Sequence, residues 1–213
     1  MKTEELVTLL ATGLEPVDSH RALRRFPVAW IVGLPAALLV TVGWLGFNPA
    51  LLAELRLPMF WVKASFCASV AMATFIAVRR LARPGSRLGR VPMAMAVPVL
   101  AMWLLAVVVL VDAPPQERAA LMLGHTALVC PWRITVLSAP LFVTLIWALR
   151  GTAPTQLRLA GAAAGFAAGS GGALCYTLHC PELAAPFLAI WYLIGMLIPA
   201  ALGAFLGSYL LRW

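Results

Sequence analysis

The chain has 213 residues, of which 62% are apolar and 11% are charged, and its mean hydropathy is +0.93. Soluble domains carry roughly 25% charged residues, so this composition excludes a water-soluble globule, a disordered chain and a disulfide-rich miniprotein. The net charge is +8. The basic residues stand at the ends of apolar runs, where they set the orientation of a membrane protein, and we expect no direct contact with nucleic acid.

The first feature along the chain is a short amphipathic helix, predicted within residues 3–13. Thr3 can cap its start, and Glu4 and Glu5 suit the positive end of a helix dipole. Its apolar stripe consists of Leu6, Leu9, Leu10 and Leu14. We expect residues 1–26 to form a cytoplasmic segment. The pattern leaves two roles open for its helix, which can lie on the membrane surface or dock in a groove of a basic protein partner.

Six apolar runs follow, each close to the length that a helix needs to cross a bilayer. We expect these spans at residues 27–46, 59–78, 91–111, 134–149, 157–178 and 187–210, with the fourth beginning nearer Cys130. The runs are continuous rather than alternating, which indicates helices instead of barrel strands. The predicted fold class is therefore all-α, a polytopic integral membrane protein in which residues 27–213 form a bundle of six transmembrane helices.

The distribution of Lys and Arg predicts the orientation of this bundle. Twelve of the 16 basic residues fall in the N-terminal segment, in the links between spans two and three and between spans four and five, and in the tail. The other four are Arg56, Lys63, Arg118 and Arg133. Cytoplasmic loops carry the excess of Lys and Arg, so both termini are predicted to be cytoplasmic.

Glycines at four-residue spacing predict close contact between the last two spans. Gly161, Gly165 and Gly169 line one face of the fifth span, and Gly203 and Gly207 line one face of the sixth. Lipid supplies no hydrophobic force between helices, so close backbone contact at small residues becomes important. We expect these two faces to pack together; a glycine-lined substrate path is the alternative.

The sequence lacks the usual marks of enzymes and coupled transporters. Such transporters bury a carboxylate or a histidine within a span, whereas all eight acidic residues here lie outside the apolar runs or at their ends. Lys63 and Arg133 enter a span near its outer end, where we expect their long side chains to snorkel to the surface. No HExxH, GxSxG or phosphate-binding glycine loop is present. We therefore expect no enzymatic activity.

The four cysteines all map to the outer half of the predicted bundle. Cys67 and Cys175 are interpreted as small apolar core residues. Cys130 and Cys180 are each followed by proline, and we expect both at the membrane surface, facing a compartment where disulfides persist. The spacing leaves three readings open for this pair: a structural disulfide, a redox sensor, or a thiolate site for a soft metal.

Two histidines stand beside this pair in the sequence. His179 precedes Cys180, and His125 lies five residues before Cys130. Either could serve as a nitrogen ligand or, as a cation, lower the pKa of a thiol. No CxxC motif is present, which argues against an ordinary thiol oxidoreductase or structural zinc site. We expect no resident cofactor, and a transient soft metal ion is the ligand that Cys130, Cys180 and His179 suggest.

Several short motifs carry a family resemblance over nearly the whole chain. They are Cys130-Pro131, Ser138-Ala139-Pro140, Arg150 to Thr155, Cys175 to Glu182, Pro186-Phe187, Trp191-Tyr192 and Leu211-Arg212-Trp213, with Met1 to Leu6 and Glu15 to Asp18 at the start. This set resembles the NrsF-type family, the negative regulators of sigma F. Members of that family are six-span inner-membrane anti-sigma factors of proteobacteria.

The resemblance implies a function and a location. It implies that the chain sequesters an ECF-type sigma factor at the bacterial inner membrane, with the N-terminal helix as the docking segment. It also implies that Cys130 and Cys180 form a stress-sensing pair on the periplasmic side. The resulting hypothesis is that oxidation or soft-metal binding at the pair repacks the bundle and releases the sigma factor. The alternatives are a membrane redox protein that holds haem or quinone through His125, His179 and the cysteines, and a small transporter.

Overall fold

The computed structural model describes residues 3–12, 19–86 and 88–212, and the described residues form helices and connecting turns without a β-strand. The helix predicted near the N-terminus is present as α1 (Thr3–Ala11). Glu4 and Glu5 of its first turn are exposed, as is Val7. Leu14 lies outside the described residues, and so do the side chains of Leu6, Leu9 and Leu10.

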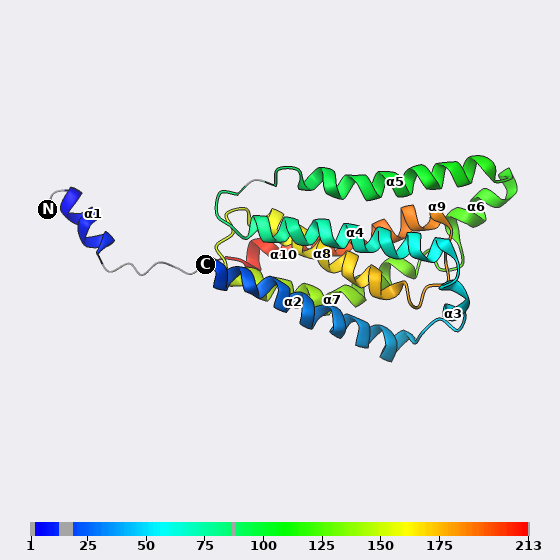
Figure 1. Ribbon diagram of the computed structural model, residues 1–213, viewed down its shortest axis with the longest axis horizontal. Coiled ribbons are helices and arrows are strands. Elements are labelled where there is room, and N and C mark those ends of the chain that lie inside the picture. The colour runs from blue at the N-terminus through cyan, green and yellow to red at the C-terminus, as the bar shows by residue number, and fades with distance from the viewer. Residues whose placement is uncertain (1–2, 13–18, 87, 213) are drawn as a thin grey trace.

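The remaining helices form an elongated bundle (Figure 1). Its long elements are α2 (Ser19–Val40) continued by the π-helical turn η1 (Thr41–Leu45), α4 (Pro58–Leu81), α5 (Val91–Asp112), α7 (Cys130–Arg150), α8 (Leu157–Tyr176), and α9 (Ala185–Phe187) continued by the π-helical turn η2 (Leu188–Tyr192) and α10 (Leu193–Leu210). The short helices α3 (Leu51–Glu54) and α6 (Pro115–Leu123) lie in the links. Each of the six predicted spans is therefore a helix.

Five helices of the described chain are long and apolar enough to cross a membrane: Arg24–Leu45, Pro58–Leu81, Val91–Asp112, Cys130–Arg150 and Ala185–Leu210. The first of them is formed by α2 and η1, and α2 begins at Ser19, ahead of the boundary predicted at residue 27. Phe26 is fully buried, so the bundle starts before that boundary. The prediction of a sixth span rests on α8, which is a helix but is not among these five.

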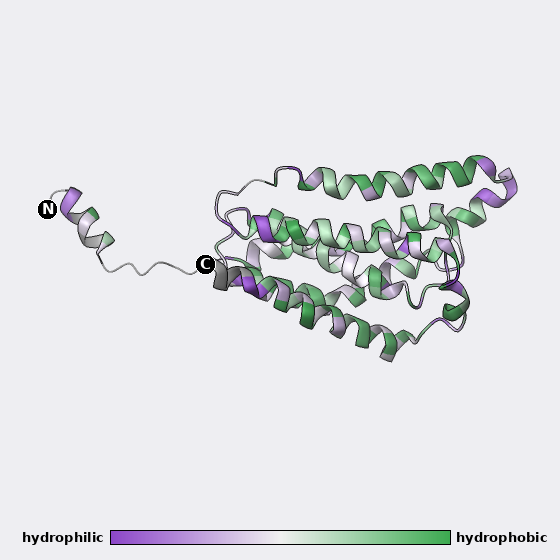
Figure 2. Ribbon diagram, viewed as in Figure 1, coloured by the Kyte–Doolittle hydropathy of each residue, from purple (hydrophilic) through white to green (hydrophobic). Residues whose placement is uncertain are grey.

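The position of α8 explains its weak hydropathy. It lies at the centre of the bundle and contacts α10, α7, α4 and α2 (Figure 1). Most of its residues are buried glycines and alanines, whereas the peripheral helices α2 and α5 are strongly hydrophobic (Figure 2). A helix surrounded by protein needs small residues for close packing rather than long apolar side chains for contact with lipid.

The contact between α8 and α10 is made through the predicted glycines. A Cβ atom on Gly161 would collide with the carbonyl oxygen of Gly203, and one on Gly165 would collide with that of Pro199. A Cβ on Gly169 would lie 2.8 Å from the carbonyl oxygen of Met196. Gly207 likewise lies against Gly161 and the carbonyl oxygen of Leu157. The two backbones therefore touch along the whole interface.

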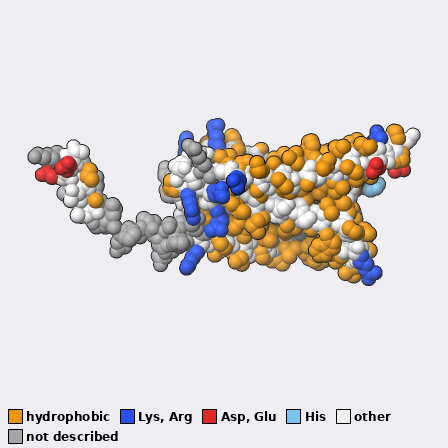
Figure 3. All heavy atoms as spheres, turned by 45° about the horizontal axis from the view of Figure 1, so that its top comes forward, with side chains coloured by type: hydrophobic (Ala, Val, Ile, Leu, Met, Phe, Trp, Pro, Cys, Tyr) orange, Lys and Arg blue, Asp and Glu red, His pale blue; other side chains and the backbone are white. Residues whose placement is uncertain are grey.

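The two ends of the bundle differ in charge (Figure 3). Basic side chains gather at the end where α2 begins and α10 ends, which we call the arginine-rich end: Arg24, Arg25, Arg79, Arg80, Arg83, Arg90, Arg150, Arg158 and Arg212. The opposite end carries α3, α6 and the turn between α8 and α9, and we call it the cysteine end. This asymmetry is the one on which the predicted orientation depends.

Candidate functional site: a buried thiol pair at the cysteine end

Cys130 and Cys180 meet at the cysteine end. Cys130 is the first residue of α7, and Cys180 lies in the turn between α8 and α9. The two thiols lie close enough to act on each other, and no disulfide joins them. Both side chains are fully buried, at 0% exposure. The pair is therefore enclosed by protein at the cysteine end, and its location at the membrane surface stays a prediction.

The side chain of Lys63 lies where the sequence did not predict it. Instead of snorkelling outward, its side chain is fully buried, at 0% exposure. Its Nζ donates hydrogen bonds to the carbonyl oxygens of Cys180, at 2.8 Å, and Glu182, at 3.2 Å. It also lies over the ring of Phe60, 5.6 Å from the ring centroid, in the geometry of a cation–π contact. The lysine thus ties α4 to the turn between α8 and α9.

The surroundings of the pair are apolar and aromatic. Cys67 of α4 is fully buried in the same cluster and lies close enough to Lys63 and Cys180 for their charges to act on it. Tyr176 and Tyr192 pack against each other with ring centroids 5.9 Å apart. Their buried hydroxyl groups have no hydrogen-bond partner of good geometry. The thiols are thus enclosed by apolar and aromatic side chains.

The electrostatics of the site distinguish the two thiols. The pKa of the Cys180 thiol is lowered by the neighbouring Cys130 thiol and by the positive charge of Lys63, while burial opposes both effects. Cys180 is thus the sulfur of this pair that we expect to ionise. Because the thiolate is the reactive form of cysteine, this arrangement suits a reactive Cys180.

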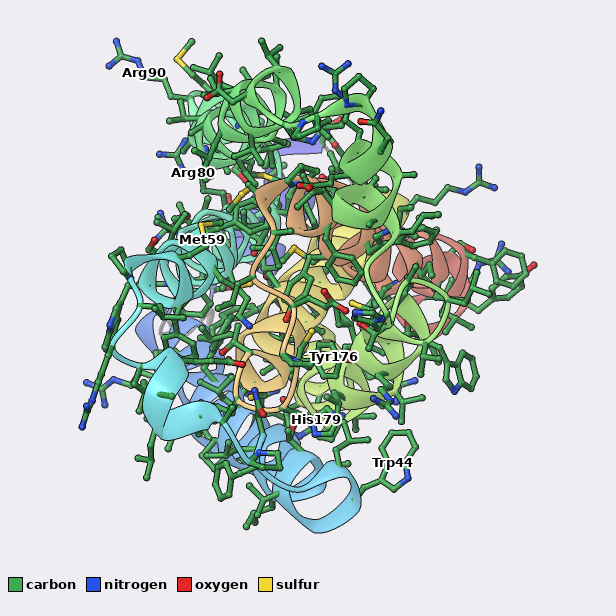
Figure 4. All side chains as sticks on the ribbon, turned by 90° about the vertical axis from the view of Figure 1, so that its right-hand side faces the viewer. Trp44, Met59, Arg80, Arg90, Tyr176 and His179 are labelled. Atoms are coloured by element: carbon green, nitrogen blue, oxygen red, sulfur yellow. The ribbon has the colours of Figure 1, made fainter. Side chains whose placement is uncertain are left out.

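Three further contacts hold the turn that contains Cys180. The backbone N–H of Asn48 donates to the carbonyl oxygen of Leu178 at 3.0 Å. The carboxylate of Glu182 accepts a hydrogen bond of 2.7 Å from the backbone N–H of His125. The third contact joins the ring of His179 to the carbonyl oxygen of Gly46, in the link after η1. His179 lies near the centre of the cysteine end (Figure 4). The turn is therefore fixed to α4, to the link after η1 and to the link before α7.

Neither predicted histidine is placed as a ligand of the thiols. The ring nitrogens of His179 contact Arg133 and the carbonyl oxygen of Gly46, each at 3.1 Å. His125 is exposed and joins the site through its backbone. Among the described residues, no three His, Cys, Asp or Glu side chains are grouped as a metal ion would require. The described side chains thus offer a soft metal the two sulfur atoms without a third ligand.

Cys175 stands apart from the pair. Its Sγ lies 3.9 Å from the carbonyl oxygen of Leu34, on the side of α8 that faces α2. It therefore keeps the core role that the sequence suggested. Cys67 is likewise a fully buried core residue, and it lies close to Lys63. One signal in the sequence could have revealed this, because Lys63 and Cys67 are four residues apart and so share one face of α4.

Comparison with known proteins decides the family. A family model described as the negative regulator of sigma F (NrsF) matches residues 10–213. The chain belongs to the NrsF family. Two curated relatives match over the full length of both chains. The probable anti-sigma-F factor NrsF of Azospira oryzae is 46% identical over 213 residues, and the anti-sigma-F factor NrsF of Caulobacter vibrioides is 39% identical over 221 residues. No solved structure matches the chain.

The family consists of negative regulators of a sigma factor, which agrees with a regulator rather than an enzyme. The described chain is helical, with several helices able to cross a membrane.

Proposed function

We propose that this protein is an anti-sigma factor of the bacterial inner membrane with six spans, α8 being the fifth, and with both termini in the cytoplasm. In this arrangement the arginine-rich end faces the cytoplasm and the cysteine end faces the periplasm, as the positive-inside rule favours. Figure 1 draws α1 beyond the arginine-rich end, so α1 lies on the side where a cytoplasmic partner would bind.

The partner is an ECF-type sigma factor, and α1 is its docking segment. Glu4 and Glu5 are acidic and exposed in the first turn of α1. The leucines of the stripe supply the apolar anchors that a helix needs to bind in a groove. The basic residues between α4 and α5 flank the same end, so they can support the complex.

The signal acts at Cys130 and Cys180. The observation that carries this step is that two free thiols from separate segments, one at the start of α7 and one in the turn after α8, lie in one buried cluster. Oxidation to a disulfide would add a covalent link between these segments. For oxidation to release the sigma factor, the reduced and the oxidised protein must differ in their affinity for it. A tenfold difference in that affinity corresponds to about 1.4 kcal/mol.

Co-purification in detergent tests the docking segment. The tagged protein is expressed with the sigma factor, and residues 2–12 are deleted so that α2, which begins at Ser19, stays intact. A milder variant is Glu4→Lys, and its matched control is Glu117→Lys, because α6 is also a nine-residue helix with a glutamate in its first turn but lies at the cysteine end. We expect the deletion to abolish binding, Glu4→Lys to weaken it, and Glu117→Lys to leave it unchanged. Retained binding after the deletion would overturn this assignment.

A further inference from the structure

Lys63 places an amino group in an apolar part of the bundle. It is fully buried, and the partners of its Nζ are two carbonyl oxygens and one aromatic ring, which are all neutral. Within the described part of the chain, no carboxylate forms an ion pair with it. A buried ammonium group is costly unless an opposite charge compensates it. For Lys63 to keep its proton there, a neighbouring group must carry negative charge.

Two kinds of group compete for that role. The first is Glu54 of α3, but its Oε1 accepts a hydrogen bond of 2.6 Å from Asn48 and its Oε2 makes no hydrogen bond. The second is the sulfur of Cys180, whose own carbonyl oxygen is 2.8 Å from Nζ. Among the described residues, Lys63 donates a hydrogen bond to Cys180 and none to Glu54.

We propose that Lys63 is a positioning residue of the sensor: it holds the turn that carries Cys180 and is the counter-ion of the Cys180 thiolate. This inference rests on the proposed function of the thiol pair and adds an order to its chemistry, with Cys180 reacting first. Lys63 is suited to both tasks, since its hydrogen bonds fix the turn while its charge favours the ionised sulfur.

The other groups that face Cys180 agree with this order. Cys130 lies in the same buried cluster as Cys180, so its thiol can donate a hydrogen bond to a Cys180 thiolate. Cys67 is another buried thiol, which prefers the neutral form in apolar surroundings. The titratable and charged groups around the site are Lys63 and Cys67 of α4, Cys130 and Arg133 of α7, Tyr176 of α8, Tyr192 of η2, Glu54 of α3 and Glu182 of the turn.

The chemistry needs a two-electron oxidant, and a hydroperoxide is small and neutral enough to enter a buried site. The Cys180 thiolate attacks one oxygen of hydrogen peroxide, the O–O bond breaks, and the released hydroxide takes a proton to become water. The Cys130 sulfur then displaces hydroxide from the Cys180 sulfenic acid and loses its proton, which gives a disulfide and a second water. The two thiols lose two electrons and two protons, and one peroxide is reduced to two waters.

The test measures the reactivity of Cys180 alone in the full-length protein in detergent. A background with Cys67→Ala, Cys175→Ala and Cys130→Ser leaves one thiol and keeps a hydroxyl donor beside it. Its rate of reaction with methyl methanethiosulfonate, a small neutral reagent, is followed by mass spectrometry from pH 5 to pH 9. Three variants are compared: Lys63→Met removes both charge and donors, Lys63→Gln keeps donors without charge, and Lys63→Arg keeps both.

We expect Lys63→Gln and Lys63→Met to move the midpoint of the pH profile upward by about one unit, so that the rate at pH 6 falls roughly tenfold while the rate at pH 9 does not fall. Lys63→Arg should keep the midpoint close to that of the parent. A lysine with a purely structural role would change the rate equally at every pH, and that result would overturn the proposal. If the Lys63 variants do not fold, the parent profile decides, because a midpoint at or above about 8.5, the ordinary value for cysteine, contradicts a thiolate held by Lys63.

This measurement is independent of the sigma factor. If the pH profile follows expectation while oxidation fails to release the sigma factor, the role of Lys63 stands and the proposed signal falls. If release works but the profile does not depend on the charge at position 63, the signal stands and the role of Lys63 falls.

Discussion

The ring of His179 accepts a hydrogen bond from Arg133, with 3.1 Å between Nε2 and the guanidinium nitrogen. A guanidinium group can only donate, so Nε2 is the acceptor, and the proton of the neutral ring must be on Nδ1. Nδ1 in turn lies 3.1 Å from the carbonyl oxygen of Gly46, to which it donates. One imidazole thus joins the start of α7, the turn after α8 and the end of η1.

This relationship predicts the effect of His179→Phe. The substitution keeps an aromatic ring of similar size but removes both hydrogen bonds and leaves the half-buried Arg133 without its acceptor. We expect a loss of roughly 1–3 kcal/mol in the free energy of unfolding, measured by thermal or denaturant unfolding in detergent. The control is Trp44→Phe, because Trp44 is 54% exposed. Equal stability of the two variants would show that the imidazole does not join these segments.

The thiol pair predicts a specific disulfide. Treatment of the purified protein with hydrogen peroxide should link the peptides that contain Cys130 and Cys180, as detected by mass spectrometry without reduction. Replacing either residue by serine should abolish this link and the oxidant-dependent release of the sigma factor. The control is Cys175→Ser, which should behave as wild type because Cys175 faces α2 at Leu34. Normal release by the double variant Cys130→Ser/Cys180→Ser would end the sensing proposal.

The glycine contact predicts that Gly161→Ala destabilises the bundle. The added methyl group would meet the carbonyl oxygen of Gly203, which belongs to the backbone and cannot rotate away. Overpacking of this kind costs typically about 1–3 kcal/mol, more than alanine regains through its helix propensity. The matched control is Gly43→Ala, where a new Cβ has nothing within 4 Å. A Gly161→Ala variant that unfolds at the same temperature as the control would contradict the tight interface.

A tryptophan joins the π-helical turn η2 to α6. Trp191 donates a hydrogen bond from Nε1 to the carbonyl oxygen of Met122 at 2.8 Å. Trp191→Phe removes this bond but keeps most of the packing, so we expect a loss of about 0.5–1.5 kcal/mol. Trp132→Phe is the control, since Trp132 is 64% exposed. The difference between the two variants in unfolding free energy measures the bond, and no difference would show that α6 is not held through Trp191.

Hydropathy predicted the positions of the long helices because each run is continuous and ends at charged or turn-forming residues. The fourth span begins at Cys130, where the prediction had moved its start. Hydropathy predicted neither α6 nor the π-helical turns. A short polar helix has no periodic pattern of apolar residues, and an irregular hydrogen-bond ladder has no signature in hydropathy. The start of α2 at Ser19 was missed for the same reason, since its first residues are largely polar.

The site was predicted in part. The pairing of Cys130 with Cys180 was predicted from their outer position and the proline that follows each of them. Spacing left a structural disulfide, a sensor and a metal site open, and the family resemblance favoured the sensor. The burial of Lys63 could not be predicted from its position near the end of a span, because a long flexible side chain can turn either way. Its direction depends on the carbonyl oxygens of Cys180 and Glu182, which the tertiary fold alone brings to it.

The central position of α8 has a consequence for how the chain enters the membrane. Leu, Ile, Val and Phe supply the favourable free energy of transfer into lipid, and α8 is instead rich in Gly and Ala. In the proposed six-span arrangement, α8 alone would therefore partition poorly when it leaves the insertion machinery. Its neighbours α7 and α10 are among the helices apolar enough to span on their own. Stable insertion of the fifth span must then wait for the sixth, so biogenesis of the C-terminal half depends on the same glycine contact that holds the finished bundle.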